Sequence, residues 1–229
     1  MIALVTGATG FIGHHLVAQL LWQSFSVRIL TRGIHPLPEA LAQQVEIVYG
    51  DLVDKISILK SVSGCDIVFH LAGELNNPSR MFLVNLEGTD SLLKSCRQVG
   101  IKQVIYLSSV GVMGTRRSGS VDETELCHPQ NIYEKSKLGA EILVLKWAAE
   151  SATRGVVIRP TNVFGCGPRN RLDSMVSWLQ SIKSGRFVFF DRQAISNYVY
   201  VEDVVDPSVP SMSDPERKNR GYANRSTRN

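Results

Sequence analysis

The stretch MIALVTGATGFIGHHLVAQL, residues 1–20, decides the fold. Ile2–Val5 is a short run of β-forming residues, and the amphipathic run Gly13–Ser24 follows it after the segment 6–13, TGATGFIG. A turn without side chains lets the backbone approach a pyrophosphate, and a helix N-terminus supplies N–H donors and the positive end of the helix dipole. Three glycines at this spacing also form ordinary tight turns, but their place between a strand and a helix favours a dinucleotide-binding site.

The rest of the chain alternates short apolar runs with longer amphipathic stretches. The expected strands are Val27–Leu30, Val45–Tyr49, Ile67–Leu71, Val104–Leu107 and Val156–Ile158, and the expected helices are Asp54–Ser63, 80–98 and 132–152. Strands separated by helices imply right-handed crossovers and a parallel sheet that is covered on both faces. We therefore expect the α/β class, with a Rossmann-like, doubly wound parallel sheet and an incomplete small C-terminal substrate region.

Changes in composition divide the chain into three expected parts. Residues 1–160 form an NAD(P)-binding domain, and residues 161–205 form a partial substrate-binding region. The elements expected in this second part are a helix over 173–184 and strands near 187–190 and 197–201. In residues 206–229, three prolines fall within nine positions and little apolar surface remains, so we expect a disordered tail.

The composition is that of a globular protein, with 44% apolar residues, 20% charged residues and a net charge of +4. So small a charge gives no reason to expect nucleic acid or an anionic membrane as a partner. No apolar stretch approaches the ~18–20 residues of a membrane span, and the N-terminus has no signal-peptide pattern. The four cysteines contain no C-x-x-C pair, so we expect reduced thiols in a cytoplasmic protein rather than a zinc site.

The choice of cofactor depends on the end of the second expected strand, where the sequence is Leu30-Thr31-Arg32. A carboxylate there would bind the ribose 2′-OH of NAD, whereas an arginine accepts the 2′-phosphate of NADP. No acid is present at this strand end, and Arg32 lies beside the position. The sequence thus favours NADP over NAD, with a solvated surface arginine as the alternative interpretation.

A second motif is the pair Tyr133 and Lys137, four residues apart in an expected helix. Side chains at this spacing share one helix face, and an ammonium near a phenol stabilises the phenolate and lowers its pKa. Tyr133 is therefore a candidate general acid–base. Alone, such a pair is more often a solvated helix face, but Ser108 and Ser109 follow the expected strand Val104–Leu107. Serines at that edge of a parallel sheet lie where ligands bind.

Together these motifs resemble the extended short-chain dehydrogenase/reductase superfamily, specifically its NAD-dependent epimerase/dehydratase group, over about residues 2–205. The matching segments are 6–13, Gly50-Asp51-Leu52, His70-Leu71-Ala72-Gly73, Asn85 with Gly88-Thr89, Leu107-Ser108-Ser109, Tyr133 with Lys137, 159–165 and 198–204. Their number and order are highly specific for the superfamily and only weakly specific for a substrate.

The resemblance implies a role for each matching residue. Tyr133 would exchange a proton with the substrate, Lys137 would hold the nicotinamide ribose and lower the pKa of Tyr133, and Ser109 would hydrogen-bond the reacting oxygen. Asp51 and Leu52 would flank the adenine. The predicted cofactor-binding residues are Gly7, Thr9, Gly10, Phe11, Ile12, Gly13, Arg32, Asp51, Leu52, Leu71, Ala72, Gly73, Asn85, Tyr133 and Lys137.

The implied activity is hydride transfer to or from a secondary alcohol or ketone, with a nucleotide sugar as one candidate small-molecule substrate. Val110 and Gly111 stand where resembling 4,6-dehydratases carry acidic residues, and Met113 stands where many epimerases carry tyrosine. These departures introduce an alternative, an NADPH-dependent reductase or dehydrogenase of a hydrophobic ketone or sterol-like substrate. The resembling proteins usually dimerise through helices that correspond to 80–98 and 132–152, so a homodimer is a candidate assembly.

The resemblance weakens at the C-terminal end of the chain. Relatives continue after the segment 198–204 with further substrate-domain elements, whereas here Asp206 begins a polar, proline-rich stretch. We therefore expect a truncated or frameshifted product. A third alternative follows from this expectation, a nucleotide-binding protein with weak catalysis.

Overall fold

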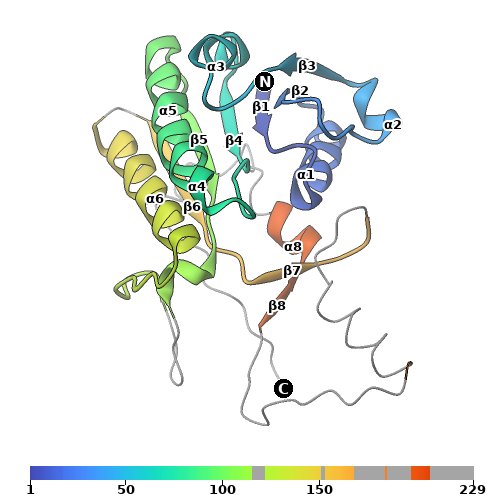
Figure 1. The fold of residues 1–229 in the computed structure, drawn as a ribbon. Coiled ribbons are helices and arrows are strands. Elements are labelled where there is room, and N and C mark those ends of the chain that lie inside the picture. The colour runs from blue at the N-terminus through green and yellow to red at the C-terminus, as the bar shows by residue number, and fades with distance from the viewer. Residues whose placement is uncertain (115–121, 151–152, 168–183, 185–196, 207–229) are drawn as a thin grey trace.

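A computed structural model describes residues 1–114, 122–150, 153–167, 184 and 197–206 (Figure 1). The expected strand near 187–190 lies outside the described residues. So do the expected helix over 173–184 and the expected tail 206–229, apart from residues 184 and 206.

The first two thirds of the chain form a six-stranded parallel sheet in the order β3-β2-β1-β4-β5-β6. Its strands are β1 (Ile2–Thr6), β2 (Ser26–Thr31), β3 (Val45–Tyr49), β4 (Ile67–His70), β5 (Gln103–Leu107) and β6 (Arg154–Ile158). The strand order reverses between β1 and β4, which makes that boundary the topological switch point where ligands bind in open α/β sheets. The predicted Rossmann-like, doubly wound sheet is confirmed.

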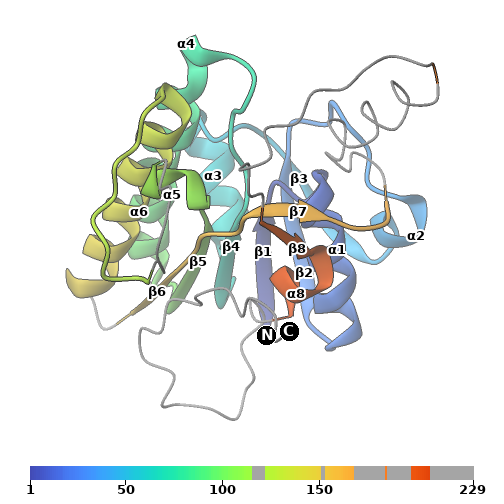
Figure 2. The ribbon, with the colours of Figure 1, turned by 90° about the horizontal axis from the view of Figure 1, so that it is seen from below.

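Helices cover both faces of this sheet (Figure 2). They are α1 (Phe11–Trp22), α2 (Glu39–Ala42), α3 (Lys55–Val62), α4 (Pro78–Met81), the π-helical turn η1 (Phe82–Glu87), α5 (Gly88–Val99), the 3₁₀ turn η2 (Val110–Met113) and α6 (Ile132–Glu150). One face carries α3, α5 and α6, and the other carries α1. Within the described residues, no helix combines the length and the apolar character that a bilayer crossing requires.

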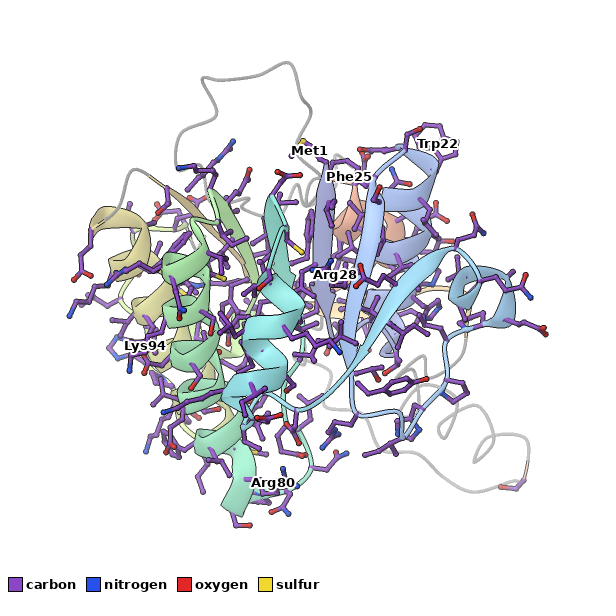
Figure 3. The ribbon with its side chains drawn as sticks, turned by 90° about the horizontal axis from the view of Figure 1, so that it is seen from above. Met1, Trp22, Phe25, Arg28, Arg80 and Lys94 are labelled. Atoms are coloured by element: carbon purple, nitrogen blue, oxygen red, sulfur yellow. The ribbon has the colours of Figure 1, made fainter. Side chains whose placement is uncertain are left out.

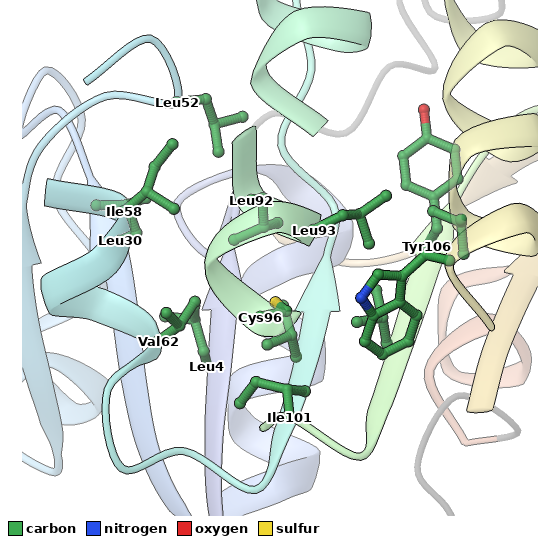
Figure 4. Packing of buried hydrophobic residues seen from close by; sticks show 14 of the residues in the cluster. Leu4, Leu30, Leu52, Ile58, Val62, Leu92, Leu93, Cys96, Ile101 and Tyr106 are labelled. Atoms are coloured by element: carbon green, nitrogen blue, oxygen red, sulfur yellow. The ribbon is translucent and has the colours of Figure 1, made fainter. Parts of the chain in front are cut away.

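The alternation of side chains along β1 builds two separate apolar cores. Leu4 points into the core beneath α3, α5 and α6, whereas Ala3 and Val5 point into the core beneath α1. Figure 4 shows the first core, with Leu92 and Cys96 of α5 packed toward the sheet. All four residues of β4 are buried, as predicted for a strand covered on both faces.

Arg28 of β2, labelled in Figure 3, connects the sheet to α3. Its Nε donates to Glu46 of β3 at 2.7 Å, and its Nη1 donates to the carbonyls of Ser61 and Ser63 at 3.0 and 2.6 Å. These carbonyls lie at the C-terminal end of α3, where a cation is favoured by the helix dipole. This ion pair and its hydrogen bonds hold α3 in place beside the sheet.

A second, two-stranded sheet consists of β7 (Asn162–Phe164) and β8 (Tyr198–Tyr200), and α8 (Val201–Val205) follows it. The strand expected near 197–201 is one residue longer at each end than β8. Val201, Val204 and Val205 are all buried, and this helical spacing packs α8 against α1. The domain boundary after residue 160 stays a prediction.

Most of the other expected elements match to within a few residues. The helix expected over 80–98 begins earlier, at Pro78, because the Asn77 side chain accepts a hydrogen bond from the Ser79 N–H at 3.1 Å and caps α4. Four elements had not been expected: α2, β7, the 3₁₀ turn η2 and α8. They span three to five residues, which is too short for a hydrophobic period to be read from the sequence.

Candidate functional site

The segment 6–13 forms a tight turn between β1 and α1. Gly7 has a φ of +74°, and a Cβ atom on it would lie 2.6 Å from the backbone nitrogen of Ala72 and 2.8 Å from the carbonyl carbon of Leu71. A Cβ on Gly13 would overlap the carbonyl oxygen of Gly7. Both positions therefore require glycine, and the turn lies directly against the residues that follow β4.

The same turn exposes the N-terminus of α1. Gly10 is the N-cap residue in an extended conformation, and no described side chain caps the helix there. The first turn of α1 also carries no acidic side chain. Because the first N–H groups of a helix have no partner within it, this end is suited to hold an anion. A cradle that a Cβ would fill, open at a helix N-terminus, fits the pyrophosphate of a dinucleotide.

Lys137 of α6 reaches the sheet edge from the opposite side of the switch point. Its side chain is almost fully buried, and its Nζ donates to the Leu107 carbonyl at the end of β5 at 2.6 Å. The Nζ also lies 4.2 Å from the ring centroid of Tyr106. A Cβ on Gly73 would lie 4.0 Å from this Nζ, so Lys137 is next to the loop that follows β4.

The charge of Lys137 is set by two opposing effects. Burial lowers its pKa to about 7, and the charge of Glu141, one turn further along α6, acts in the opposite direction. Glu141 is itself buried and accepts hydrogen bonds from Arg159, with the Nη2–Oε2 distance at 2.6 Å. This ion pair keeps an anionic charge one helical turn from Lys137.

Tyr133 and Ser109 lie near Lys137. Tyr133 is half-buried in the first turn of α6, and its charge raises the pKa of Tyr106, after the larger effect of burial. Ser109 follows β5 and is the N-cap residue of η2, where its Oγ accepts from the Gly111 N–H at 3.1 Å. Ser109 and the Nζ of Lys137 are therefore both at the carboxyl end of β5, and Tyr133 is one helical turn before Lys137.

Asn85 connects the loop after β4 to α6. Its Nδ2 donates to the Glu74 carbonyl at 3.0 Å and to the Ser136 Oγ at 2.9 Å, and its Oδ1 accepts from the Glu74 N–H at 2.6 Å. It lies in η1, a π-helical turn of the kind often found at functional sites. Both amide hydrogens of Asn85 are donated within the protein and connect the loop to α6. The predicted contact of Asn85 with the cofactor stays a prediction.

His70 is a member of the site to which the sequence analysis gave no role. It is buried at the end of β4, with Nδ1 2.7 Å from the Thr6 Oγ1 and Nε2 2.9 Å from the Thr89 Oγ1. Thr89 donates to the Asn85 carbonyl, so its oxygen accepts from a hydrogen on Nε2. Burial and the charge of Lys137 lower the pKa of His70 to about 3, which keeps the ring neutral. His70 therefore links the end of β1 to α5 through Thr6 and Thr89. The signal in the sequence was a histidine at the end of a run of apolar strand residues.

Three predicted cofactor residues interact with residues other than Lys137, Ser109 and Tyr133. Arg32 is exposed just beyond β2, and its charge adds to the backbone hydrogen bonds, chiefly from Asn76, that lower the pKa of Glu74. Asp51 lies 3.7 Å from Arg80. Leu52 is 5% exposed and packs in the core, so little of its side chain is left to contact a ligand.

The strand order and the glycine cradle define an α/β protein of the dinucleotide-binding class. Comparison with known proteins refines this class. The chain belongs to the NAD dependent epimerase/dehydratase family, whose sequence model matches residues 3–223. This result confirms the resemblance that the motifs indicated.

Curated relatives differ in the reactions that their names describe. The chain is 32% identical to 3beta-hydroxysteroid-dehydrogenase/decarboxylase isoform 1 of Arabidopsis thaliana over 90% of the chain and 51% of that protein. It is 29% identical to UDP-glucose 4-epimerase of Pisum sativum over 91% of the chain and 71% of that protein. The chain spans about half the length of the first of these relatives.

Solved structures share the fold. The protein MoeE5 in complex with UDP-glucose and NAD is 29% identical, with a TM-score of 0.80 over 95% of this chain and 74% of MoeE5. UDP-glucose 4-epimerase of Thermotoga maritima with UDP-glucose is 27% identical, with a TM-score of 0.78 over 91% of this chain and 72% of the epimerase. The family supports a nicotinamide dinucleotide cofactor, but nothing in these comparisons supports the preference for NADP predicted from Arg32.

Proposed function

We propose that the chain is an NAD(P)-dependent oxidoreductase of the dehydrogenase or epimerase type, acting on a secondary alcohol or ketone. The observation that carries this proposal is the position of Lys137, whose buried Nζ lies at the end of β5, beside Gly73 and one turn after Tyr133. Burial of an ammonium group reduces the stability of the fold. A buried lysine beside a tyrosine is therefore better explained by a role in proton transfer than by a contribution to stability.

The backbone of the segment 6–13 is proposed to bind the pyrophosphate, together with Leu71, Ala72 and Gly73 at the end of β4. A bound nicotinamide dinucleotide supplies the hydride donor or acceptor. Tyr133 gives or takes the proton at the substrate oxygen. The remaining roles follow from the contacts of the side chains around it.

Protonated Lys137 lowers the pKa of Tyr133 because a nearby ammonium stabilises the phenolate. Since burial brings the pKa of Lys137 to about 7, the fraction that carries this charge changes near neutral pH. The Oγ of Ser109, already fixed by the Gly111 N–H, is the proposed hydrogen-bond donor to the substrate oxygen. The carboxylate of Glu141, which accepts a hydrogen bond from Arg159, supports the charged form of Lys137.

Substitution of Tyr133 tests the catalytic part of the proposal. The Tyr133→Phe variant should lower the turnover of an oxidised or reduced substrate by about 10²–10⁴-fold, because general acid–base catalysis contributes that much. Absorbance of the reduced nicotinamide measures this turnover. The matched control is Tyr49→Phe, since Tyr49 is 70% exposed on β3. Unchanged turnover in Tyr133→Phe would contradict the assignment and favour a nucleotide-binding protein without this chemistry.

Net turnover of the cofactor separates the two reaction types. A dehydrogenase or reductase changes the absorbance of the reduced nicotinamide in proportion to product, whereas an epimerase leaves it unchanged overall. The relatives include proteins named for hydroxysteroids and for UDP-glucose, so both a sterol-like and a nucleotide-sugar substrate belong in the first assays.

The choice between NAD and NADP is also open to a direct test. Exposed Arg32 beyond β2 supports NADP, and the NAD-bound structures of similar proteins support NAD. If Arg32 binds the 2′-phosphate, Arg32→Ala should weaken NADPH binding and leave NADH binding unchanged. Equal loss of binding for both cofactors, or no loss for either, would show that Arg32 does not discriminate between NAD and NADP.

All four cysteines are free thiols, which supports the proposed cytoplasmic location.

A homodimer is supported by apolar residues on the outer surface of α6 and η1. Ile142 and Leu145 of α6 are 58% and 50% exposed, and Phe82 and Leu83 of η1 are 43% and 40% exposed. The two elements pack against each other, so these residues belong to one side of the molecule. Sedimentation of the wild type and of Ile142→Glu tests the assembly, since a dimer through this side should dissociate on introduction of the charge.

A further inference from the structure

A shallow cavity of about 610 Å³, open to solvent, lies against Tyr133. Its lining is mixed, with the apolar residues Leu75, Pro78, Met81 and Ile132 beside the polar residues Gln130, Asn131 and Lys135. We propose that this cavity binds the ring system of an apolar cyclic alcohol or ketone, and so selects a hydrophobic substrate over a nucleotide sugar. The inference deepens the proposed function, on which it rests, by naming the substrate class. Cavities of this volume hold ligands of several rings.

The apolar part of the lining is partly exposed to solvent. Leu75, in the loop after β4, is 42% exposed, and Ile132, the first residue of α6, is 45% exposed. Met81 of α4 is buried beside them. A ligand that covers Leu75 and Ile132 removes apolar surface from water on both partners, which is favourable in proportion to the area buried.

One polar residue of the lining, Asn131, is bonded within the protein. The amide of Asn131 donates to the Glu134 Oε1 at 2.7 Å, and its Oδ1 accepts from the Glu134 N–H at 2.9 Å. The other carboxylate oxygen of Glu134 accepts from the Gln130 N–H at 2.6 Å. These bonds fix the wall formed by the start of α6.

Lys135 is the one charged side chain among the described residues that line the cavity. Recognition of a nucleoside diphosphate typically uses arginine forks or several oriented N–H donors. A cavity whose apolar side chains lie next to the candidate acid–base Tyr133 is suited to a ligand that brings its reacting oxygen to Tyr133 and covers Leu75 and Ile132 with apolar rings.

Binding of 2-decalol and 2-decalone, two-ring apolar probes, tests the inference by calorimetry on the 229-residue chain without cofactor. UDP-glucose is titrated in parallel. We expect saturable binding of the decalin probes, none or weaker binding of UDP-glucose, and about tenfold or greater weakening of the decalin probes in Ile132→Asn. The matched control is Ile56→Asn, since Ile56 also lies at a helix N-terminus, on α3, and is 80% exposed.

Each result decides the inference. Tighter binding of UDP-glucose, no binding of either decalin probe, or equal affinity in wild type and Ile132→Asn would overturn it. Should Ile132→Asn fail to fold, Leu75→Asn in the loop replaces it with the same expected weakening. A thermal-unfolding titration with NADH and with NADPH is run on every variant. A chain that NADH stabilises while the decalin probes fail keeps the proposed function and loses the inference. A chain without response to NADH or NADPH loses the proposed function itself.

Discussion

The two sides of the switch point build their parts of the site by different means. At the turn between β1 and α1, the backbone forms the site, and glycine is needed because a Cβ at Gly7 or Gly13 would meet other backbone atoms. At the ends of β4 and β5, buried polar side chains form it, and His70, Asn85 and Lys137 are each held by hydrogen bonds. The glycine turn requires room for its backbone, whereas the side chains at β4 and β5 require hydrogen-bond partners. Substitutions should therefore destabilise the first side through steric overlap and the second through unpaired buried polar groups.

The largest expected effect is a steric one on the glycine side. Gly7→Ala places a methyl group against the backbone of Ala72 at a φ of +74°, so we expect a loss of about 4 kcal/mol in the free energy of unfolding, or failure to fold. Denaturant unfolding measures this loss. Gly10→Ala is the matched control, because its Cβ would meet only the Gly7 carbonyl oxygen, at 3.2 Å, and it should cost about 1 kcal/mol or less. Equal losses would contradict the steric account.

The next effect is electrostatic and lies on the side-chain side. The pKa of Lys137 is about 7 in the folded protein and 10.5 without burial, so the unfolded chain binds more protons between these values. The wild type should therefore gain stability relative to Lys137→Met as the pH rises from 7 to 10, by about 3 kcal/mol. Unfolding curves across this range measure the difference. Lys94→Met, at a 75% exposed side chain, should follow the wild type. A difference that does not change with pH would show that Lys137 is not desolvated.

A third prediction concerns the loop that Asn85 holds. Asn85→Ala leaves the N–H and carbonyl of Glu74 and the Oγ of Ser136 without this partner, and we expect a loss of about 2–3 kcal/mol in stability. Asn77→Ala removes only the exposed cap of α4 and should cost about 1 kcal/mol. Thermal unfolding of the two variants compares these losses. If Asn77→Ala costs as much as Asn85→Ala, the buried amide network is not what fixes the loop.

The smallest expected effect has the opposite sign. The hydroxyl of Tyr106 is buried and has no hydrogen-bond partner among the described residues, which is unfavourable. Tyr106→Phe keeps the ring beneath Lys137 and removes this group, so stability should stay the same or rise by up to about 1 kcal/mol. Figure 4 shows Tyr106 at one end of the core cluster. A loss of more than 1 kcal/mol in denaturant unfolding would mean that the hydroxyl is bonded in solution.

The same contrast explains what could be predicted from the sequence. The strands and the glycine turn could be predicted because residue type and spacing alone fix them, and the alternation of strands and helices predicts a parallel sheet. The order of the strands could not be read from this alternation, because doubly wound sheets with the same alternation differ in their order. The bonds of Asn85 to Glu74 and Ser136 join residues that are far apart in the chain, so no local pattern could indicate them. The short strand β7 and helix α8 depend on tertiary packing, as the burial of Val205 against α1 shows.

The candidate catalytic residues could be predicted from the sequence only in part. Tyr133 and Lys137 could be paired from their spacing, but the burial that lowers the pKa of Lys137 depends on β5 and on the loop at Gly73. Leu52 is a matched motif position whose side chain is mostly in the core, and its predicted place beside the adenine stays a prediction. A motif thus locates a residue at a site without stating whether its side chain or its backbone contributes.

The most direct test of the central claim, that the glycine turn binds a nicotinamide dinucleotide, is a thermal-unfolding titration of the 229-residue chain with NADH and with NADPH. A ligand that binds only the folded state adds about 2.7 kcal/mol at a hundredfold excess over its Kd. We predict a rise in the unfolding temperature that saturates with at least one of the two cofactors. A clear unfolding transition that neither cofactor shifts would contradict the claim.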